Sequence, residues 1–207
     1  MNQTAERTTA VVFDVGKVLV EWDLRYLFAK LIDDADELDW FLANVVTPEW
    51  HFEHDAGIDL GARLVERKQL FPNHADLIDA YATRYAESIP GPVADMPALV
   101  RQLAARDIPL FAITNFGAEF WDQFRPTEPL FDLFRDIVVS GVERLIKPDP
   151  RIFTLAAGRF GLAPEEMLFI DDNAANIASA EGLGWQVHHF TGAERLAEDL
   201  QARGLIA

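Results

Sequence analysis

The chain has 207 residues, of which 50% are hydrophobic and 25% charged, a composition typical of a globular protein with one substantial core. Its 34 acidic residues outnumber its 18 Lys and Arg residues, so the formal net charge is −16. Because nucleic-acid phosphates are bound by clustered Lys and Arg, this acidity argues against a nucleic-acid partner. The absence of Cys excludes disulfides, thiolate metal sites and thiol nucleophiles.

Residues 1–9 are polar and contain no apolar central segment, so they do not have the pattern of a signal peptide. No run of residues approaches the roughly 20 apolar positions that a membrane-spanning helix requires. We therefore expect a cytoplasmic protein without a membrane partner. The sequence does not predict its oligomeric state.

The first predicted strand covers residues 11–13, which are apolar and rich in β-branching. Asp14 follows this strand directly, and Gly16 breaks the apolar pattern two residues later. Since ligands bind beyond the carboxyl ends of strands in an open parallel sheet, Asp14 lies where a nucleophile or metal ligand is expected. A structural Asp that ends a strand or begins a turn fits this stretch alone equally well.

Residues 22–92 predict a helical insertion after the first strand. Apolar residues recur there at helical spacing in three runs: Leu24, Leu27, Phe28 and Leu31; Leu38, Phe41, Leu42 and Val45; and Leu77, Tyr81, Tyr85 and Ile89. Pro and Gly separate these runs, and the stretch contains no convincing strand pattern. We therefore predict a helical cap domain at residues 22–92 and an α/β domain formed by residues 1–21 and 93–207.

From residue 93 onward, apolar strands alternate with amphipathic helices. Strands are predicted at residues 108–113, 137–139, 167–170 and 185–188. Asp149 is a suitable N-cap for a helix that begins at Pro150 and stops at Gly161, and a second helix is predicted at 174–181. This alternation predicts an α/β fold in which a parallel sheet is flanked by helices on both faces.

Polar side chains follow three further predicted strands. They are Thr114-Asn115, Lys147 in the next strand's exit loop, and Asp171-Asp172. Because parallel strands end at one edge of a sheet, we expect these groups to converge with Asp14. Taken singly, each has an ordinary structural reading: a strand-end hydroxyl, a solvated lysine and a helix N-cap beside a second acid.

Together these groups match the needs of phosphoryl transfer. A carboxylate such as Asp14 can attack phosphorus and form an aspartyl-phosphate. The carboxylates of Asp14 and Asp172 are oxygen ligands that suit Mg²⁺, which neutralises phosphate charge. Lys147 adds a positive charge, while Thr114 and nearby backbone N–H groups can bind the remaining phosphate oxygens.

The polar groups occur along the chain in a fixed order: Asp14; Thr114-Asn115; Lys147-Pro148; and Asp171-Asp172-Asn173 with Asn176. This order resembles the four motifs of the haloacid dehalogenase superfamily over nearly the whole chain. A helical insertion directly after the first motif resembles the type 1 cap of that superfamily. Residues 13–20 (FDVGKVLV) and 169–177 (FIDDNAANI) look most like the subfamily that contains bacterial glucose-1-phosphate phosphatase.

The resemblance implies a Rossmann-like parallel sheet and a role for each motif residue. Asp14 would be the nucleophile and a Mg²⁺ ligand, joined by the backbone carbonyl of Gly16 and by Asp172, with Asp171 beside it or acting through water. The transferring phosphoryl group would be held by Thr114, the Asn115 backbone and Lys147. The implied activity is Mg²⁺-dependent hydrolysis of a small phosphorylated metabolite, for which a sugar phosphate is the best candidate.

Position 16 departs from the common motif, because most phosphatases of this superfamily have an Asp there that moves protons, whereas Gly16 has no such group. The glucose-1-phosphate phosphatase-like subfamily resembles this chain in having Gly as well. His51, His54 and Asp55, in a stretch at 50–57 predicted as non-helical, are candidate replacements, and we predict that His51 and His54 bind substrate. Two surface histidines near a turn are the plainer interpretation.

Two other functions remain open. A 2-haloacid dehalogenase also uses an Asp nucleophile, but it works without metal and has no need for the paired carboxylates Asp171 and Asp172. A non-catalytic domain that binds a phosphorylated ligand would keep the fold without turnover. We predict that the phosphatase is correct, and that Trp22 and Phe116 help the 50–57 stretch to shape its leaving-group pocket.

Overall fold

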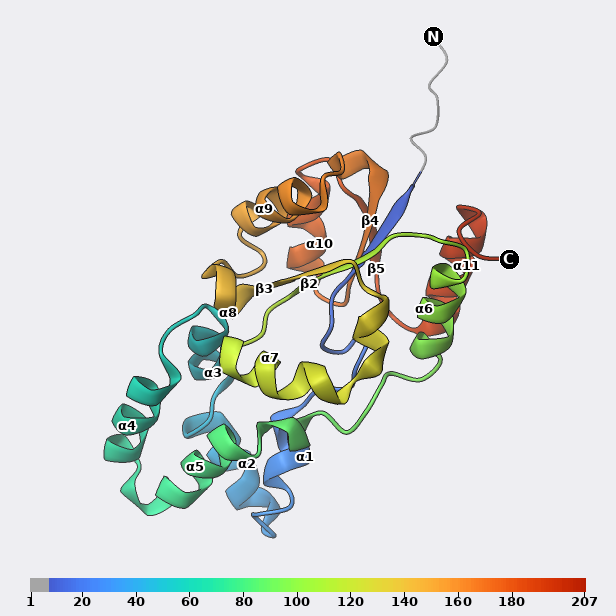
Figure 1. Cartoon of the computed structure of the whole chain (residues 1–207). Helices are drawn as coiled ribbons and strands as arrows, with labels where there is room; N and C mark the ends of the chain where they lie inside the picture. Colours follow the sequence, from blue (N-terminus) through green and yellow to red (C-terminus); the bar gives the residue numbers. More distant parts are fainter. Residues whose placement is uncertain (1–7) are drawn as a thin grey trace.

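The computed structural model describes residues 8–207, and the first seven residues of the N-terminal stretch considered above lie outside this range. Five strands form one parallel sheet in the order β3-β2-β1-β4-β5 (Figure 1). The strands are β1 (Ala10–Phe13), β2 (Leu110–Thr114), β3 (Asp136–Val139), β4 (Met167–Asp171) and β5 (Gln186–His189). The predicted α/β fold is confirmed.

The central strand β1 pairs with β2 on one side and with β4 on the other. Every residue of these three strands is buried, as expected for parallel strands that are covered on both faces. Phe13 aligns with Ala112 and with Ile170, so the chain leaves β1, β2 and β4 at the same edge of the sheet. This register positions the functional groups described below.

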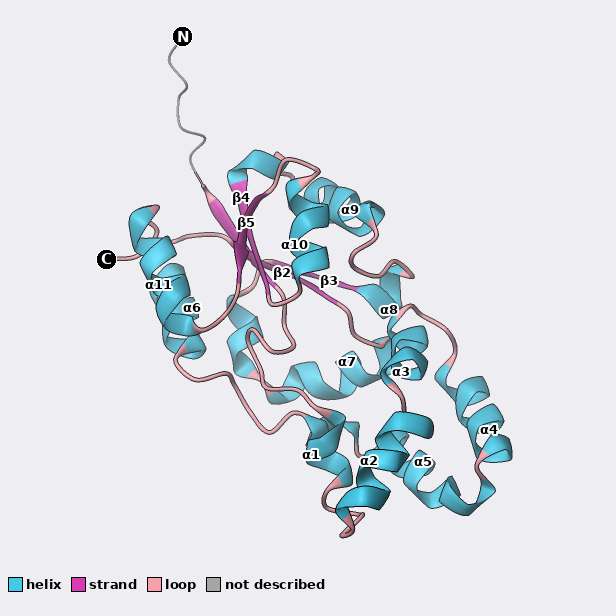
Figure 2. Cartoon of the chain, turned by 180° about the vertical axis from the view of Figure 1, so that it is seen from behind, coloured by secondary structure: helices cyan, strands magenta, loops and turns pink. Residues whose placement is uncertain are grey.

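Helices cover the two faces of the sheet (Figures 1 and 2). On one face α6 (Met96–Ala104) and α11 (Ala193–Ala202) pack against a set of strand residues that includes Val11 and Phe13. On the other face α9 (Pro150–Phe160) packs against a set that includes Val12, and α10 (Ala174–Glu181) lies on the same side. Successive residues of β1 therefore pack into the hydrophobic layers on opposite faces of the sheet.

The chain between β1 and β2 is helical, and no strand lies between Leu24 and Ser88 in this described part of the chain. Its elements are α1 (Leu24–Phe28), α2 (Ala35–Asn44), α3 (Pro48–Asp55), α4 (Leu60–Leu70), η1 (Pro72–His74), α5 (Ala75–Thr83) and η2 (Tyr85–Ser88). Figure 1 shows these helices below the sheet, and the division at residues 22–92 into a separate cap domain stays a prediction.

Two details of this segment differ from the sequence predictions. The stretch at 50–57 is not a loop: Thr47 caps a helix that starts at Pro48, and α3 runs to Asp55. The apolar run from Leu77 to Ile89 is not one helix, because α5 ends at Thr83 and a 3₁₀ turn follows. By contrast, the predicted Asp149 cap and Gly161 stop of α9 are confirmed, and Gly161 has the expected positive φ of 68°.

The connections between the later strands are also helical. They are α7 (Ala118–Phe124), η3 (Arg125–Thr127), η4 (Pro129–Leu133), α8 (Ser140–Glu143) and η5 (Pro164–Glu166). The aromatic side chains of Phe116, Phe120, Trp121 and Phe124 are buried, and the rings of Phe116, Trp121 and Phe124 contact one another. Within residues 8–207, no helix has both the length and the apolar character needed to cross a bilayer.

Gly141 marks a close approach between α8 and the loop after β2. A Cβ atom at Gly141 would lie 2.5 Å from the Ala118 nitrogen and 2.8 Å from the Phe116 oxygen, which are backbone atoms. We therefore expect Gly141→Ala to lower the free energy of unfolding by about 1–3 kcal/mol, as overpacking does. The control is Gly158→Ala on α9, where the space is open and Ala should stabilise by about 0.5–1 kcal/mol. Urea denaturation of both variants tests this prediction, and equal effects would contradict it.

Candidate active site

The ends of β1 and β4 bring two carboxylates to one lysine. The backbone N–H of Asp14 donates to the Ile170 carbonyl at 2.8 Å, which fixes Asp14 beside the end of β4. Lys147 Nζ lies 2.8 Å from Asp14 Oδ1 and 2.7 Å from Asp171 Oδ2. Three residues from three distant motifs are therefore in direct contact at one edge of the sheet.

Asn115 holds the Lys147 backbone in place. Its side-chain nitrogen donates to the Lys147 carbonyl at 3.0 Å, and its side-chain oxygen accepts from the Lys147 N–H at 2.8 Å. Both the nitrogen and the oxygen of the Asn115 side-chain amide are thus hydrogen-bonded to the backbone of Lys147. The side chain of Asn115 therefore positions Lys147.

The buried charges at this edge shift one another's pKa values. Burial raises the pKa of Asp14 to about 7, and Asp171 adds to this effect while Lys147 opposes it. Burial alone would lower the pKa of Lys147, but the two carboxylates outweigh burial and raise it, so Lys147 remains a cation. One buried cation therefore faces two buried carboxylates, and an additional cation would be favourable here.

The carboxylate oxygens of Asp14, Asp171 and Asp172 lie within 4.8 Å of one another. Asp171 is oriented by the Asn173 N–H at 2.8 Å and by the Asn176 side chain at 3.0 Å, in addition to Lys147. Burial, followed by the charge of Asp171, raises the pKa of Asp172. A cluster of oxygen ligands with excess negative charge fits a hard divalent cation.

Thr114, at the end of β2, is buried with its hydroxyl unpaired. Only 1% of the residue is exposed, and Oγ1 has no hydrogen-bond partner among residues 8–207. Buried hydroxyl groups are normally satisfied, and leaving one unpaired costs about 1–3 kcal/mol. Thr114 ends β2 beside Asn115, but it is not among the residues that line the cavity described next.

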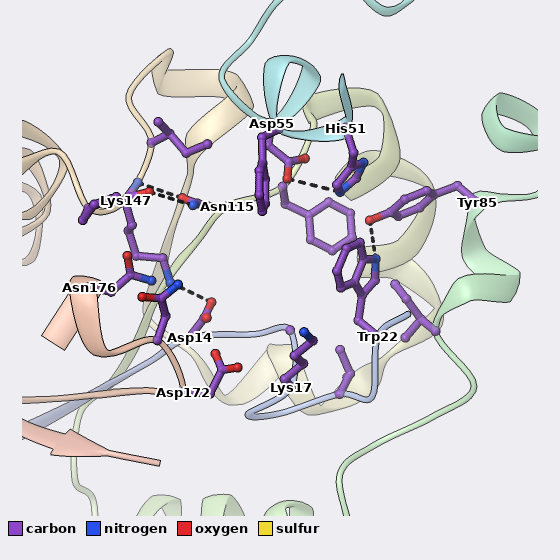
Figure 3. A pocket seen from close by; sticks show the side chains of 18 residues that line it. Asp14, Lys17, Trp22, His51, Asp55, Tyr85, Asn115, Lys147, Asp172 and Asn176 are labelled. Atoms are coloured by element: carbon purple, nitrogen blue, oxygen red, sulfur yellow. Dashed lines mark hydrogen bonds and ion pairs between the residues drawn. The ribbon is translucent and has the colours of Figure 1, made fainter. Parts of the chain in front are cut away.

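A cavity of about 370 Å³ connects the sheet edge to the helical segment (Figure 3). Its lining includes Asp14, Gly16, Asn115, Lys147 and Asp172 from the sheet edge. Across the cavity, its lining includes Trp22, His51, Asp55, Tyr85 and Phe116. Such a volume is typical of a site for a small molecule.

His51 and Asp55 lie one helical turn apart on α3, and both face this cavity. His51 Nε2 is 3.2 Å from Asp55 Oδ2, and His51 Nδ1 is 2.6 Å from the Tyr81 hydroxyl. The His51 ring stacks on Trp22 with a centroid separation of 5.1 Å. Burial, assisted by His54, lowers the pKa of His51 to about 3, so the ring is neutral at pH 7.

His54 occupies a different environment from His51. It is not among the residues that line the cavity, and its ring packs edge-on against Phe120 at 4.8 Å. The ring also fills the space that a side chain at Gly117 would need. The structure therefore brings His51, but not His54, to the site, and His54 joins α3 to α7.

Two cavity residues, Lys17 and Tyr85, were not predicted as site residues from the sequence. By sequence, Lys17 could contact phosphate or be solvated, and the solvated interpretation is favoured. In the structure it lines the cavity, lies 5.7 Å from the Trp22 ring and opposes the rise in the Asp172 pKa. Tyr85 fits an apolar helix position by sequence, yet its hydroxyl accepts a 2.8 Å hydrogen bond from Trp22 Nε1. Only the tertiary structure shows that these side chains share one cavity.

Residues 8–184 match the protein-family model described as haloacid dehalogenase-like hydrolase. A sesquiterpene phosphatase of Aspergillus oryzae is 25% identical over 203 residues, covering 95% of this chain and 96% of that protein. A phosphoglycolate phosphatase of Yersinia pestis is 29% identical over 132 residues, covering 63% of this chain and 54% of that one.

Solved structures share the fold. A HAD family enzyme from Bacteroides thetaiotaomicron, crystallised as a magnesium complex, has a TM-score of 0.72 at 16% identity, covering 93% of this chain and 98% of that chain. The L-2-haloacid dehalogenase from Xanthobacter autotrophicus has a TM-score of 0.63 at 19% identity, covering 96% and 84% respectively. At these identities, the similarity establishes a common fold and no particular reaction.

Proposed function

This chain belongs to the haloacid dehalogenase-like hydrolase family, and we propose that it is a Mg²⁺-dependent phosphatase that acts on a small phosphomonoester. The contact of Lys147 with both Asp14 and Asp171, beside Asp172, is the observation that carries the proposal. It combines a buried carboxylate, a fixed cation and a set of oxygen ligands at one edge of the sheet. Phosphatases among the relatives support the same reaction.

In this proposal the Asp14 carboxylate attacks phosphorus, and the bond from phosphorus to the leaving oxygen breaks. The resulting aspartyl-phosphate is then hydrolysed by water, which releases phosphate and restores Asp14. Lys147 and the unpaired Thr114 hydroxyl bind the phosphoryl oxygens, together with the Asn115 backbone. Lys147 is restrained in this position, because the Asn115 side chain forms hydrogen bonds with both the N–H and the carbonyl of Lys147.

Asp14, Asp172 and the Gly16 carbonyl would hold Mg²⁺, with Asp171 beside them. The three clustered carboxylates fit such a cation, because Lys147 alone does not balance their charge. When bound, Mg²⁺ supplies a Lewis acid that neutralises the phosphate and the developing charge on it. The helical segment at 22–92 acts as a cap over the α/β domain formed by 1–21 and 93–207, since both parts line the cavity.

The resemblance of residues 13–20 and 169–177 to the glucose-1-phosphate phosphatase-like subfamily favours a sugar phosphate as substrate. A second class is favoured by the cavity wall, where Trp22, Phe52 and Phe116 present aromatic surface. An apolar alcohol fits such a wall, and a sesquiterpene phosphatase is among the relatives. Hydrolysis rates on sugar phosphates and on terpenyl phosphates, measured side by side, decide between these classes.

We expect EDTA to abolish hydrolysis of phosphate esters and added Mg²⁺ to restore it, because Lys147 alone cannot neutralise both the carboxylates and the substrate. Phosphate release from a panel of sugar and terpenyl phosphates provides the measurement. Full activity in EDTA would contradict the metal requirement.

Adding a 2-haloacid such as 2-chloropropionate to this panel tests the dehalogenase alternative. Halide release that persists in EDTA, with no phosphate release from any ester, would replace the phosphatase proposal by that alternative. The paired acids Asp171 and Asp172 favour the phosphatase.

A further inference from the structure

The proposed reaction needs a proton donor for the leaving oxygen, and Gly16 has no group that can supply one. The side chains that line the cavity outside the metal and phosphate groups include four that titrate: Lys17, His51, Asp55 and Tyr85. Tyr85 accepts a hydrogen bond from Trp22, and burial raises its pKa well above the ordinary value. Lys17 is exposed to solvent and lies close to Asp172. His51 and Asp55 are the two buried candidates.

A hydrogen-bonded chain fixes the orientation of this pair. Neutral His51 has one donor and one acceptor nitrogen. When the Tyr81 hydroxyl donates to His51 Nδ1 at 2.6 Å, the proton of the ring is on Nε2, which then donates to Asp55 Oδ2 at 3.2 Å. This arrangement leaves the other Asp55 oxygen, Oδ1, to carry a proton of its own.

Asp55 Oδ1 is a buried atom with no hydrogen-bond partner in the described part of the chain. The side chain of Asp55 is 2% exposed, and the residue lines the cavity that contains Asp14. Buried carboxyl oxygens are rarely left unpaired. Because Asp55 lines the cavity, this unpaired oxygen points to a partner on a bound ligand.

The core of the protein holds Asp55 in this position. The Ser140 hydroxyl, at the start of α8, donates to the Asp55 carbonyl at 2.6 Å and accepts from the Phe116 N–H at 2.9 Å. Ser140 is fully buried. The hydroxyl thereby joins the last turn of α3 to the strand-end loops that carry the phosphate-binding groups.

We propose that Asp55 is the proton donor to the leaving oxygen and that His51 is its positioning residue, an inference that rests on the proposed phosphatase activity. As Asp14 attacks phosphorus, the bond to the leaving oxygen breaks, and that oxygen takes the proton of Asp55 Oδ1 to leave as a neutral alcohol. In the second step, water attacks the aspartyl-phosphate and gives its proton to the Asp55 carboxylate. The cycle returns Asp14 as a carboxylate and Asp55 as an acid.

The electrostatic surroundings of Asp55 agree with this role. Burial raises its pKa to about 7, although His54 and the Gly117 N–H act in the opposite direction. The titratable groups facing it are His51 and His54 on α3, Tyr81 on α5 and Tyr85 in η2. Of these, His51 and the tyrosines are neutral at pH 7, and His54 favours the charged form of Asp55 without outweighing burial.

The test compares two esters whose leaving groups differ in their need for a proton. p-Nitrophenol leaves readily as an anion, whereas the alcohol of an alkyl or sugar phosphate does not. We expect Asp55→Asn to lower kcat/KM on an alkyl or sugar phosphate by roughly 10²-fold or more. On p-nitrophenyl phosphate, the same variant should change kcat/KM by only a few-fold. Glu49→Gln is the matched control, because it removes an exposed acid of the same helix and should change neither rate.

The pH dependence and a second variant separate proton donation from a structural role. In the wild type, kcat/KM for the alkyl ester should fall as pH rises through about 7, because Asp55 loses its proton. Asp55→Asn should remove this fall, Asp55→Glu should restore part of the rate, and His51→Gln should shift the fall along the pH axis with less effect on p-nitrophenyl phosphate. Circular dichroism confirms that each variant is folded.

Equal losses on both esters in folded Asp55→Asn, or no loss on either, would overturn the assignment of Asp55 while leaving the phosphatase proposal in place. A wild type that hydrolyses no phosphate ester with Mg²⁺ would overturn the proposed function itself, and the inference with it. The two failures are therefore distinguishable.

Discussion

Asp14→Asn is expected to lower kcat for phosphate-ester hydrolysis by roughly 10³-fold or more, because an amide cannot attack phosphorus as a carboxylate does. The fold should survive this change. Lys147 keeps its 2.7 Å contact with Asp171, and burial already disfavours the charge of Asp14. The measurement is single-turnover and steady-state hydrolysis beside a thermal melt, and the melting temperature should be unchanged or higher.

The matched control for this experiment is Asp149→Asn, which changes an acid that lies outside the cavity, at the start of α9. It should leave kcat unchanged. Trapping a covalent phosphoryl group on the wild type, but not on Asp14→Asn, would identify the intermediate. Undiminished turnover in Asp14→Asn would exclude Asp14 as nucleophile.

Lys147→Met should damage both stability and activity. Its side chain is 1% exposed, and Met would leave the carboxylates of Asp14 and Asp171 facing each other without a cation. Removing one member of a buried ion pair lowers the free energy of unfolding by about 3–5 kcal/mol. Urea denaturation in EDTA measures this loss, and hydrolysis of the best substrate with Mg²⁺ should fall by at least about 10²-fold.

Two further variants show whether buried charge is the cause. Lys68→Met removes an exposed partner of Asp79 and should change stability by at most about 1 kcal/mol. Adding Asp171→Asn to Lys147→Met should recover part of the lost stability, because one unpaired carboxylate is then neutral. A Lys147→Met variant as stable as the wild type would show that the two acids are protonated in the folded protein.

The sheet and its polar edge could be predicted because local patterns determine them. Buried parallel strands appear in the sequence as short apolar runs, and a polar residue after such a run lies at the strand exit. This reasoning placed Asp14, Thr114 and Asp171 at one edge, where the structure has them. Parallel pairing then brings neighbouring exits together without further information.

The other side of the cavity could not be predicted in the same way. The buried residues of α3 include His51, His54 and Asp55, so the helix lacks the apolar stripe by which an amphipathic helix is recognised. The contact of His51 with Tyr81 joins residues 30 positions apart on different helices. Likewise, the two hydrogen bonds from Asn115 to the Lys147 backbone depend on how two loops meet, which no local pattern encodes.

The hydrogen bond from Ser140 to the Asp55 carbonyl has a consequence for substrate range. Asp55 belongs to the helical segment, so it reaches the reacting oxygen only when α3 rests on the strand-end loops. A bulky ester could bind only with α3 displaced from Ser140. Asp14 would then attack it without a proton from Asp55, so we expect such an ester to be hydrolysed slowly. Chromogenic aryl esters do not need this proton, because their leaving group departs as an anion. A substrate survey that relies on them will therefore overstate the range of esters that the protein hydrolyses.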